Sequence, residues 1–177
     1  LNSWVWAVAA TDIVPICLVL AAGFVVAYAI SRISFPERGR AAMLFTASFA
    51  AAALFWGEPE VIIDAARYFV QAKHLELYGA GNFLAQWGTG IAAWTDLPLV
   101  PFLQGLLFTV FGETRIAVQV FTTLLFSATV ALTYLTGRTL WDQTTGACAG
   151  ALLLAMPYLL TQPALMLVDV PTMFFLT

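Results

Sequence analysis

The stretch that decides the fold is residues 116–135, which read IAVQVFTTLLFSATVALTYL. It contains no charged side chain, and a helix of about 20 residues covers the roughly 30 Å hydrocarbon core of a bilayer. Apolar and polar residues do not alternate along it, as they would in a strand of a membrane barrel. The sequence therefore predicts a transmembrane helix, and Arg138 just beyond it predicts that this end faces the cytoplasm.

The composition of the whole chain is that of a membrane protein. Hydrophobic residues make up 62% of the 177 positions, charged residues only 10%, and the mean hydropathy is +0.90. A soluble chain is about a quarter charged, and a small globule cannot bury this much apolar surface. The net charge of −3 argues against a nucleic-acid partner. We therefore expect an all-α polytopic membrane protein with a single transmembrane domain.

Four further apolar runs flank this stretch. They predict membrane helices at residues 13–30, 41–56, 146–160 and 168–177. The last run stops with the sequence, so we expect an incomplete helix and the N-terminal part of a longer protein. Basic residues gather between the first two runs, which places that connection in the cytoplasm and the N-terminus outside. These residues are Arg32, Arg38 and Arg40.

Residues 57–114 are the most polar part of the chain and are predicted to form a long first extracytoplasmic loop. Within it, residues 61–78 have the spacing of an amphipathic juxtamembrane helix lying flat at the membrane interface. Residues 79–82, Gly-Ala-Gly-Asn, are expected to end this helix. The polar face consists of Asp64, Arg67, Gln71 and His74. The expected apolar face consists of Ile62, Ala66, Phe69, Ala72 and Leu75.

Residues 97–111 are apolar but few for a complete span, and they contain two prolines and a glycine. We interpret them as a re-entrant or interfacial helix with Gly112 as its C-terminal cap. Asp96 is expected to cap the start of this helix. The alternative, a third full span, would reverse the orientation of every later helix.

Two acids are the main candidates for chemistry. Asp64 follows an outward-running helix and Asp169 precedes an inward-running one, so both are predicted at the outer face. An acid beside an apolar membrane domain is costly and is often functional. Asp64 could act as a general base in a cavity that opens outward, with Arg67 as its ion-pair partner. The plainer interpretation is that each acid only complements the first turn of its helix.

The remaining polar residues give weaker signals. Arg67, Lys73 and His74 could contact a phosphate, although a solvated or headgroup-facing edge explains them equally. Cys17 and Cys148 lie in apolar runs and are interpreted as packing residues. The sequence contains no zinc spacing, P-loop, dinucleotide fingerprint or serine elbow, so no metal ligands are predicted.

Several short motifs between residues 57 and 177 occur in the order found in a known family. The motifs are Asp64-Ala65-Ala66-Arg67-Tyr68, Ala72-Lys73-His74-Leu75, Leu97-Pro98-Leu99, Phe111-Gly112, Tyr134-Leu135-Thr136-Gly137-Arg138, Met156-Pro157, and Asp169 before Met173-Phe174-Phe175. With them the chain resembles the N-terminal part of GT-C membrane glycosyltransferases of the protein O-mannosyltransferase and aminoarabinose-transferase type, similar to glycosyltransferase family 39. The residues before position 57 match less well, because an extra first helix precedes the usual one.

The resemblance implies a sugar transferase of the cell or inner membrane whose active face is extracytoplasmic. The donor would be a polyprenyl-phosphate sugar, a membrane lipid, and the acceptor an extracytoplasmic protein or lipid. Asp64 occupies the position of the family's catalytic base, and Asp169 that of its second acid. Members usually have Asp-Glu at the first position, whereas Ala65 follows Asp64 here. No cofactor is implied for certain, although a divalent cation is compatible with the family. The expected substrate-binding residues are Arg67, Tyr68, Lys73 and His74.

Two other classes of function remain open. A non-catalytic subunit of a larger membrane complex would pair Asp64 with Arg67 and show no cavity. A transporter or channel fragment would carry its acids near the middle of the bilayer. A transferase requires Asp64 and Asp169 within about a nanometre of each other around one outward-facing cavity.

Overall fold

The computed structural model describes residues 13–32, 39–57, 63–94 and 96–177, and every regular element in these ranges is helical. The predicted all-α fold is therefore confirmed over the described chain. Arg38 and Ile62, which entered the predictions above, lie outside these ranges. The elements are α2 Ile13–Arg32, α3 Arg40–Ala53, α4 Ile63–Gln86, α5 Leu99–Phe111, α6 Arg115–Leu140, α7 Gln143–Leu154, α8 Pro157–Thr161, the 3₁₀ turn η3 Gln162–Ala164 and α9 Asp169–Leu176.

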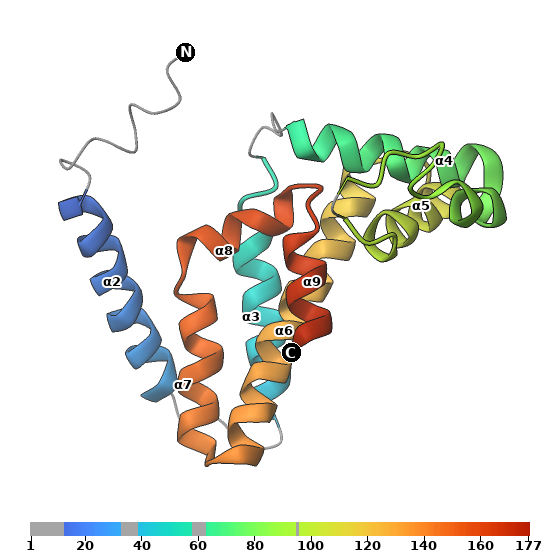
Figure 1. Cartoon of the computed structure of the whole chain (residues 1–177). Coiled ribbons are helices and arrows are strands. Elements are labelled where there is room, and N and C mark those ends of the chain that lie inside the picture. The colour runs from blue at the N-terminus through green and yellow to red at the C-terminus, as the bar shows by residue number, and fades with distance from the viewer. Residues whose placement is uncertain (1–12, 33–38, 58–62, 95) are drawn as a thin grey trace.

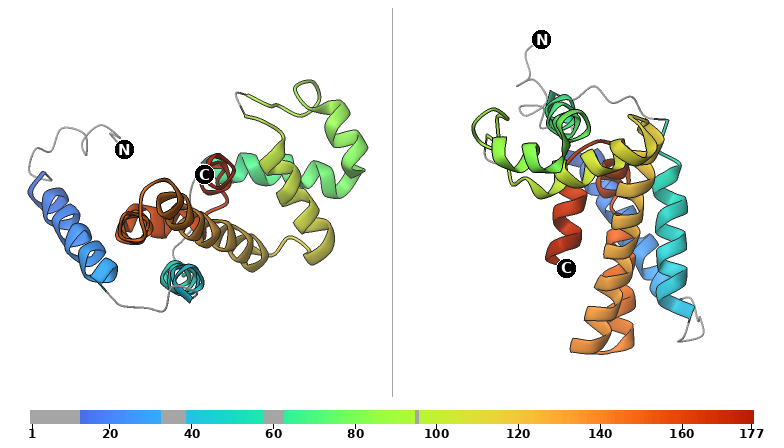
Figure 2. Two further views of the ribbon diagram at one scale, coloured as in Figure 1. Left: turned by 90° about the horizontal axis from the view of Figure 1, so that it is seen from below. Right: turned by 90° about the vertical axis from the view of Figure 1, so that its right-hand side faces the viewer.

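Helix α6 is the centre of the architecture. It packs against α3, α7 and α9, while α2 packs against the far side of α7. Helices α4 and α5 pack on each other and lie across one end of this bundle (Figures 1 and 2). The end of α2, the start of α3 and the α6–α7 turn all lie at the opposite end (Figure 1). Arg32, Arg40 and Arg138 therefore share one end of the bundle, away from α4 and α5.

Helix α6 is also the one helix in the described ranges that is long and apolar enough to cross a membrane alone. Helix α7 and the segment Tyr158–Ala164 pass the same test only as a pair bent by 64°. The stretch Leu20–Ala29, α3 and α5 are apolar but shorter. The structure thus supports one span, or two with the bent pair, and the larger number of spans stays a prediction.

Several predicted boundaries were wrong by a few residues, each for a local reason. Helix α7 begins at Gln143, before the predicted residue 146, because the Asp142 side chain caps it by accepting a hydrogen bond of 2.8 Å from the Thr145 backbone amide. Helix α6 continues through Gly137 and Arg138 to Leu140. The predicted run 146–160 is broken because Met156 precedes a proline and adopts an extended conformation.

Helices α6 and α7 pack unusually closely because glycines face each other at their contact. A Cβ atom added at Gly137 would lie 2.8 Å from the Cα of Gly146, so no larger side chain fits without a shift. Close approach through small residues is the usual way in which helices associate within a membrane. A buried apolar cluster that includes Phe126, Val130 and Tyr134 completes the core.

Buried polar side chains of α6 hold the irregular chain between α8 and α9. The Thr122 hydroxyl lies 2.7 Å from the Pro163 carbonyl oxygen, and the Gln119 amide donates to the Ala164 carbonyl at 3.3 Å. The same amide lies 3.1 Å from the carbonyl of Trp56, just beyond α3. Because an unpaired carbonyl inside an apolar bundle is costly, these contacts fix the path of the chain toward α9.

Replacing Thr122 with valine should destabilise the protein, because the Pro163 carbonyl loses its side-chain partner in a buried position. We expect a loss of about 1–3 kcal/mol, the cost of an unsatisfied buried acceptor, seen as a lower midpoint of thermal unfolding in detergent. The matched control is Thr139→Val, whose hydroxyl is exposed and bonds only to Leu135 of its own helix. Equal midpoints for the two variants would contradict the anchoring role.

Candidate functional site at one end of the bundle

Five of the six predicted site residues lie on α4, and the sixth, Asp169, is the first residue of α9. Asp64 lies in the first turn of α4, where an acid complements the helix dipole, as predicted. The predicted end at residues 79–82 is confirmed, because Gly79 has non-helical dihedral angles and separates two helical stretches of α4. Gly79 has φ 82° and ψ 164°, a conformation that glycine adopts without strain. The chain bends at Gly79, and helix continues to Gln86.

The buried face of α4 differs from the predicted apolar face. Ala66 is exposed and Phe69 is 36% exposed, so these two residues of the predicted apolar face are not buried within the protein. Ala72 and Leu75 of the predicted apolar face are buried, because α5 approaches them closely at Gly105. The buried residues are Ala65, Tyr68, Gln71, Ala72, Leu75 and Phe83.

Residues 87–94 and 96–98, here called the return segment, lie between α4 and α5 in the sequence and contact the first half of α4. The Gln71 side chain, which is buried, donates a 2.8 Å hydrogen bond to the Ala92 carbonyl oxygen of this segment. Trp94 has a φ of 52°, which is strained for a residue with a side chain. Its ring lies 5.8 Å from the guanidinium carbon of Arg67. The return segment is thus fastened to α4 on the face that carries Asp64.

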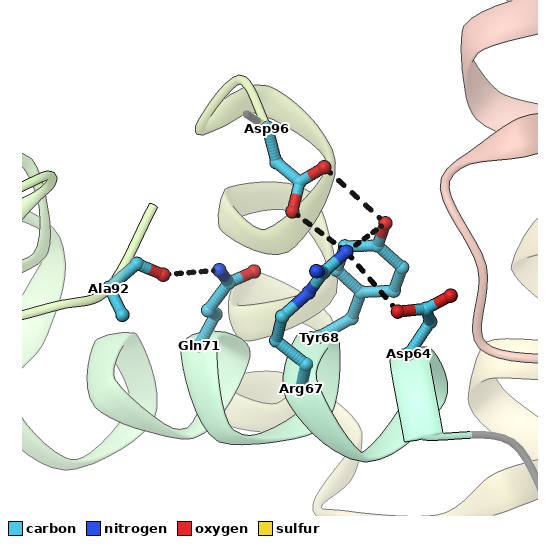
Figure 3. Close-up of polar contacts among 6 residues, drawn as sticks. All are labelled: Asp64, Arg67, Tyr68, Gln71, Ala92 and Asp96. Atoms are coloured by element: carbon cyan, nitrogen blue, oxygen red, sulfur yellow. Dashed lines mark hydrogen bonds and ion pairs between the residues drawn. The ribbon is translucent and has the colours of Figure 1, made fainter. Parts of the chain in front are cut away.

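Arg67 is the centre of the polar contacts at this place (Figure 3). Its Nη2 lies 3.0 Å from the Asp96 carboxylate and 3.5 Å from the Asp64 carboxylate. The same nitrogen donates a 2.8 Å hydrogen bond to the Tyr68 hydroxyl, which in turn lies 3.5 Å from Asp96. The structure therefore brings together three predicted site residues, Asp64, Arg67 and Tyr68. It adds Asp96, which was not predicted to belong to the site.

The protonation of this network follows from its surroundings. Burial raises the pKa of Tyr68, the hydrogen bond from Arg67 lowers it, and the nearby Asp96 charge raises it, with a net value above the ordinary one. Burial lowers the pKa of Arg67, but the Tyr68 hydrogen bond and the two carboxylates leave it raised overall. Tyr68 thus stays a hydroxyl and Arg67 a cation around neutral pH.

Asp96 is the residue that sequence reasoning missed. It was expected to cap α5, but α5 begins at Leu99 and its N-cap position is Pro98. The Asp96 side chain is instead 13% exposed and pairs with Arg67 from the adjoining helix. A carboxylate that becomes buried is usually paired with a cation, and Arg67 is one of the few basic residues in this part of the sequence.

Asp169 lies at the same end of the bundle, because α4 and α9 both begin there (Figure 1). An apolar cluster joins the two starts: it contains Ala65 and Tyr68 from α4 together with Met166, with Val168 packed against it. Asp169 is exposed and borders an open groove of about 500 Å³. The described lining of this groove is Val168, Asp169, Thr172, Met173, Leu176 and Thr177, so Asp64 is not part of it.

Lys73 and His74 do not join this network. Lys73 forms ion pairs with Glu76 at 2.9 Å and with Glu113. It lies six residues after Arg67, which is about 240° around the helix. The His74 ring stacks near the Tyr78 ring with centroids 5.6 Å apart. Lys73 therefore points to a different side of α4 from Arg67, whereas His74 lies about two helical turns beyond Arg67.

A metal site is not evident from the side chains. Within the described residues, no group of three or more His, Cys, Asp or Glu side chains is arranged to hold a metal ion. Cys17 and Cys148 are both reduced and unpaired.

The described chain is all-helical, and Asp64, Asp96 and Asp169 lie at the same end of its apolar bundle. The family model described as dolichyl-phosphate-mannose-protein mannosyltransferase matches residues 96–177, slightly less than half of the chain. The match confirms the resemblance over this stretch, which contains Asp96 and Asp169 and begins after Asp64. No curated protein and no solved structure matches the sequence.

Close packing of α5 on α4 is what brings Asp96 to Arg67, so Gly105→Ala should disturb the site. A Cβ atom at Gly105 would lie 2.7 Å from the Cβ of Leu75 and 2.8 Å from the Ala72 carbonyl oxygen. We expect a loss of about 1–3 kcal/mol of stability, because the helices must separate.

The matched control for this prediction is Gly81→Ala. Position 81 is also helical, and an added Cβ atom there meets no other atom within 4 Å. Alanine should be neutral or stabilising by about 1 kcal/mol at this position. Thermal unfolding of both variants in detergent measures the difference, and a stable Gly105→Ala protein would contradict the close packing.

Proposed function

We propose that this protein transfers a sugar from a polyprenyl-phosphate donor to an extracytoplasmic hydroxyl acceptor, with Asp64 as the general base. The observation that carries the proposal is the apolar cluster that joins the start of α4 to the chain before α9. Asp64 directly precedes Ala65 of this cluster, and Asp169 directly follows Val168. The cluster therefore supports two acids from distant parts of the sequence acting at one end of the bundle.

The family match supports the same reaction class. The matched family is described as using dolichyl phosphate mannose and a protein acceptor, so mannose and a serine or threonine hydroxyl are the first substrates to test. A lipid-linked donor needs a site that it can reach from the bilayer. Helices α4 and α5 lie across the end of the bundle, as helices at a membrane surface do.

In the proposed reaction, the acceptor oxygen attacks the anomeric carbon of the donor sugar from the side opposite the phosphate. The bond between that carbon and the phosphate oxygen breaks, and the lipid phosphate leaves with the electron pair. Asp64 takes the acceptor's hydroxyl proton as the new bond forms. Asp169, on the groove beside the cluster, orients the acceptor. Arg67 is a poor phosphate ligand because two carboxylates already surround it.

The alternative is a non-catalytic subunit in which Arg67 neutralises Asp64. An ion pair between the two residues is present, as that alternative predicts. However, Asp96 lies closer to Arg67 than Asp64 does, and the Asp64 side chain remains 57% exposed. A carboxylate with this much exposure can be reached by an acceptor, which favours the catalytic role.

The decisive variant is Asp64→Asn, which keeps the shape of the side chain and removes its ability to take a proton. Transfer of mannose from dolichyl phosphate mannose to a threonine peptide, measured in membranes that contain the protein, should fall by about 10²–10⁴-fold. Thermal stability should change little, because the Asp64 side chain is mostly exposed.

The matched control is Asp142→Asn, the same change at the opposite end of the bundle, where asparagine can still cap α7. Its transfer rate should equal that of the wild-type protein. A wild-type rate in Asp64→Asn would refute the assigned base and favour the structural subunit.

A further inference from the structure

Arg67 faces two carboxylates that differ in distance and in burial. Asp96 lies 3.0 Å from Nη2 and its side chain is 13% exposed, whereas Asp64 lies 3.5 Å away and is 57% exposed. The nearer, less solvated charge attracts the guanidinium more strongly, because water screens the exposed one. Tyr68 adds a 2.8 Å hydrogen bond to the same nitrogen. Arg67 is therefore held mainly by Asp96 and Tyr68, and only loosely by Asp64.

The contacts between Arg67 and Asp96 leave polar atoms of both side chains without a hydrogen bond in the described chain. The Asp96 contact is an ion pair without hydrogen-bond alignment, since its Oδ2 has no hydrogen-bond partner among the described residues. The Nε of Arg67 is also buried without such a partner. If the charge on Asp96 were removed, Asp64 would be the one carboxylate left in contact with Arg67 in the described chain. Arg67 would then move onto Asp64 and occupy its oxygens.

We propose that Asp96 is a positioning residue for the transfer reaction: it draws Arg67 away from Asp64 and so leaves the Asp64 carboxylate open to the acceptor hydroxyl. This inference rests on the function proposed above. Asp96 need not touch either substrate, because it acts on the base through Arg67. The return segment that carries Asp96 is also held by the hydrogen bond from Gln71 to the Ala92 carbonyl oxygen. Its attachment to α4 therefore does not depend on Asp96 alone.

The test is a double-mutant cycle with Asp96→Asn, Arg67→Gln and the combined variant, assayed with dolichyl phosphate mannose and a threonine peptide. In Asp96→Asn, kcat should fall about 10–100-fold, the cost of a misplaced catalytic group, while the donor KM stays nearly constant. The combined variant has no guanidinium that could pair with Asp64, so its kcat should be no lower than that of Arg67→Gln alone. A purely structural role for Asp96 would instead multiply the two losses.

Two further variants keep the result interpretable. Glu113→Gln breaks the Lys73–Glu113 ion pair, which joins α4 to a residue just after α5, and should keep the wild-type kcat. The Arg67–Asp96 pair joins α4 to a residue just before α5. Asp96→Glu keeps the charge, should fold, and should recover most of the kcat lost in Asp96→Asn. If Asp96→Asn does not fold, a wild-type kcat in Asp96→Glu still supports the role of the charge, and a kcat as low as that expected for Asp96→Asn overturns it.

The inference is overturned by a wild-type kcat in Asp96→Asn, by losses that multiply in the combined variant, or by an equal loss in Glu113→Gln. Asp64→Asn is assayed alongside. If that variant transfers sugar at the wild-type rate, the proposed function itself fails. If it is inactive while Asp96→Asn is fully active, only the positioning role fails.

Discussion

The candidate site depends on one constraint: irregular backbone at the end of an apolar bundle needs hydrogen-bond partners that the bundle itself must supply. Between α8 and α9 the chain leaves regular helix, and Thr122 and Gln119 of α6 bond to the carbonyls of Pro163 and Ala164. These contacts set where Met166 meets α4 and therefore where α9 starts. The position of Asp169 is thus a consequence of polar residues buried in the longest apolar helix.

The same constraint explains the return segment. Its backbone passes over α4, and the Gln71 side chain satisfies the Ala92 carbonyl. Arg67 extends toward the same segment and meets Asp96. Helix α4 consequently buries polar side chains on the face where a simple amphipathic helix would expose them. Its buried face combines small apolar residues that permit close packing with polar residues that hold a neighbouring loop.

The sequence was sufficient for features that depend on neighbouring residues. It predicted α6 from an uncharged apolar run, Asp64 in the first turn of α4, and Gly112 as the residue that ends α5, where it has φ 72°. It could not predict features that depend on packing between elements. The buried face of α4 is decided by α5 and by Met166, and the partner of Asp96 lies 29 positions earlier in the chain, at Arg67. A helical wheel of α4 alone shows neither the packing of α5 and Met166 on this helix nor the pairing of Arg67 with Asp96.

Ala65, where the resembling family usually has a glutamate, fits the way in which this chain packs. Ala65 is buried in the cluster with Tyr68 and Met166. A glutamate at position 65 would bring a carboxylate into that apolar contact, and burying an unpaired charge is costly. Alanine instead allows the chain before α9 to approach α4. The second carboxylate beside Arg67 comes instead from Asp96 on the return segment, so in this chain the pair of acids around Arg67 is drawn from two elements and leaves position 65 free for close packing.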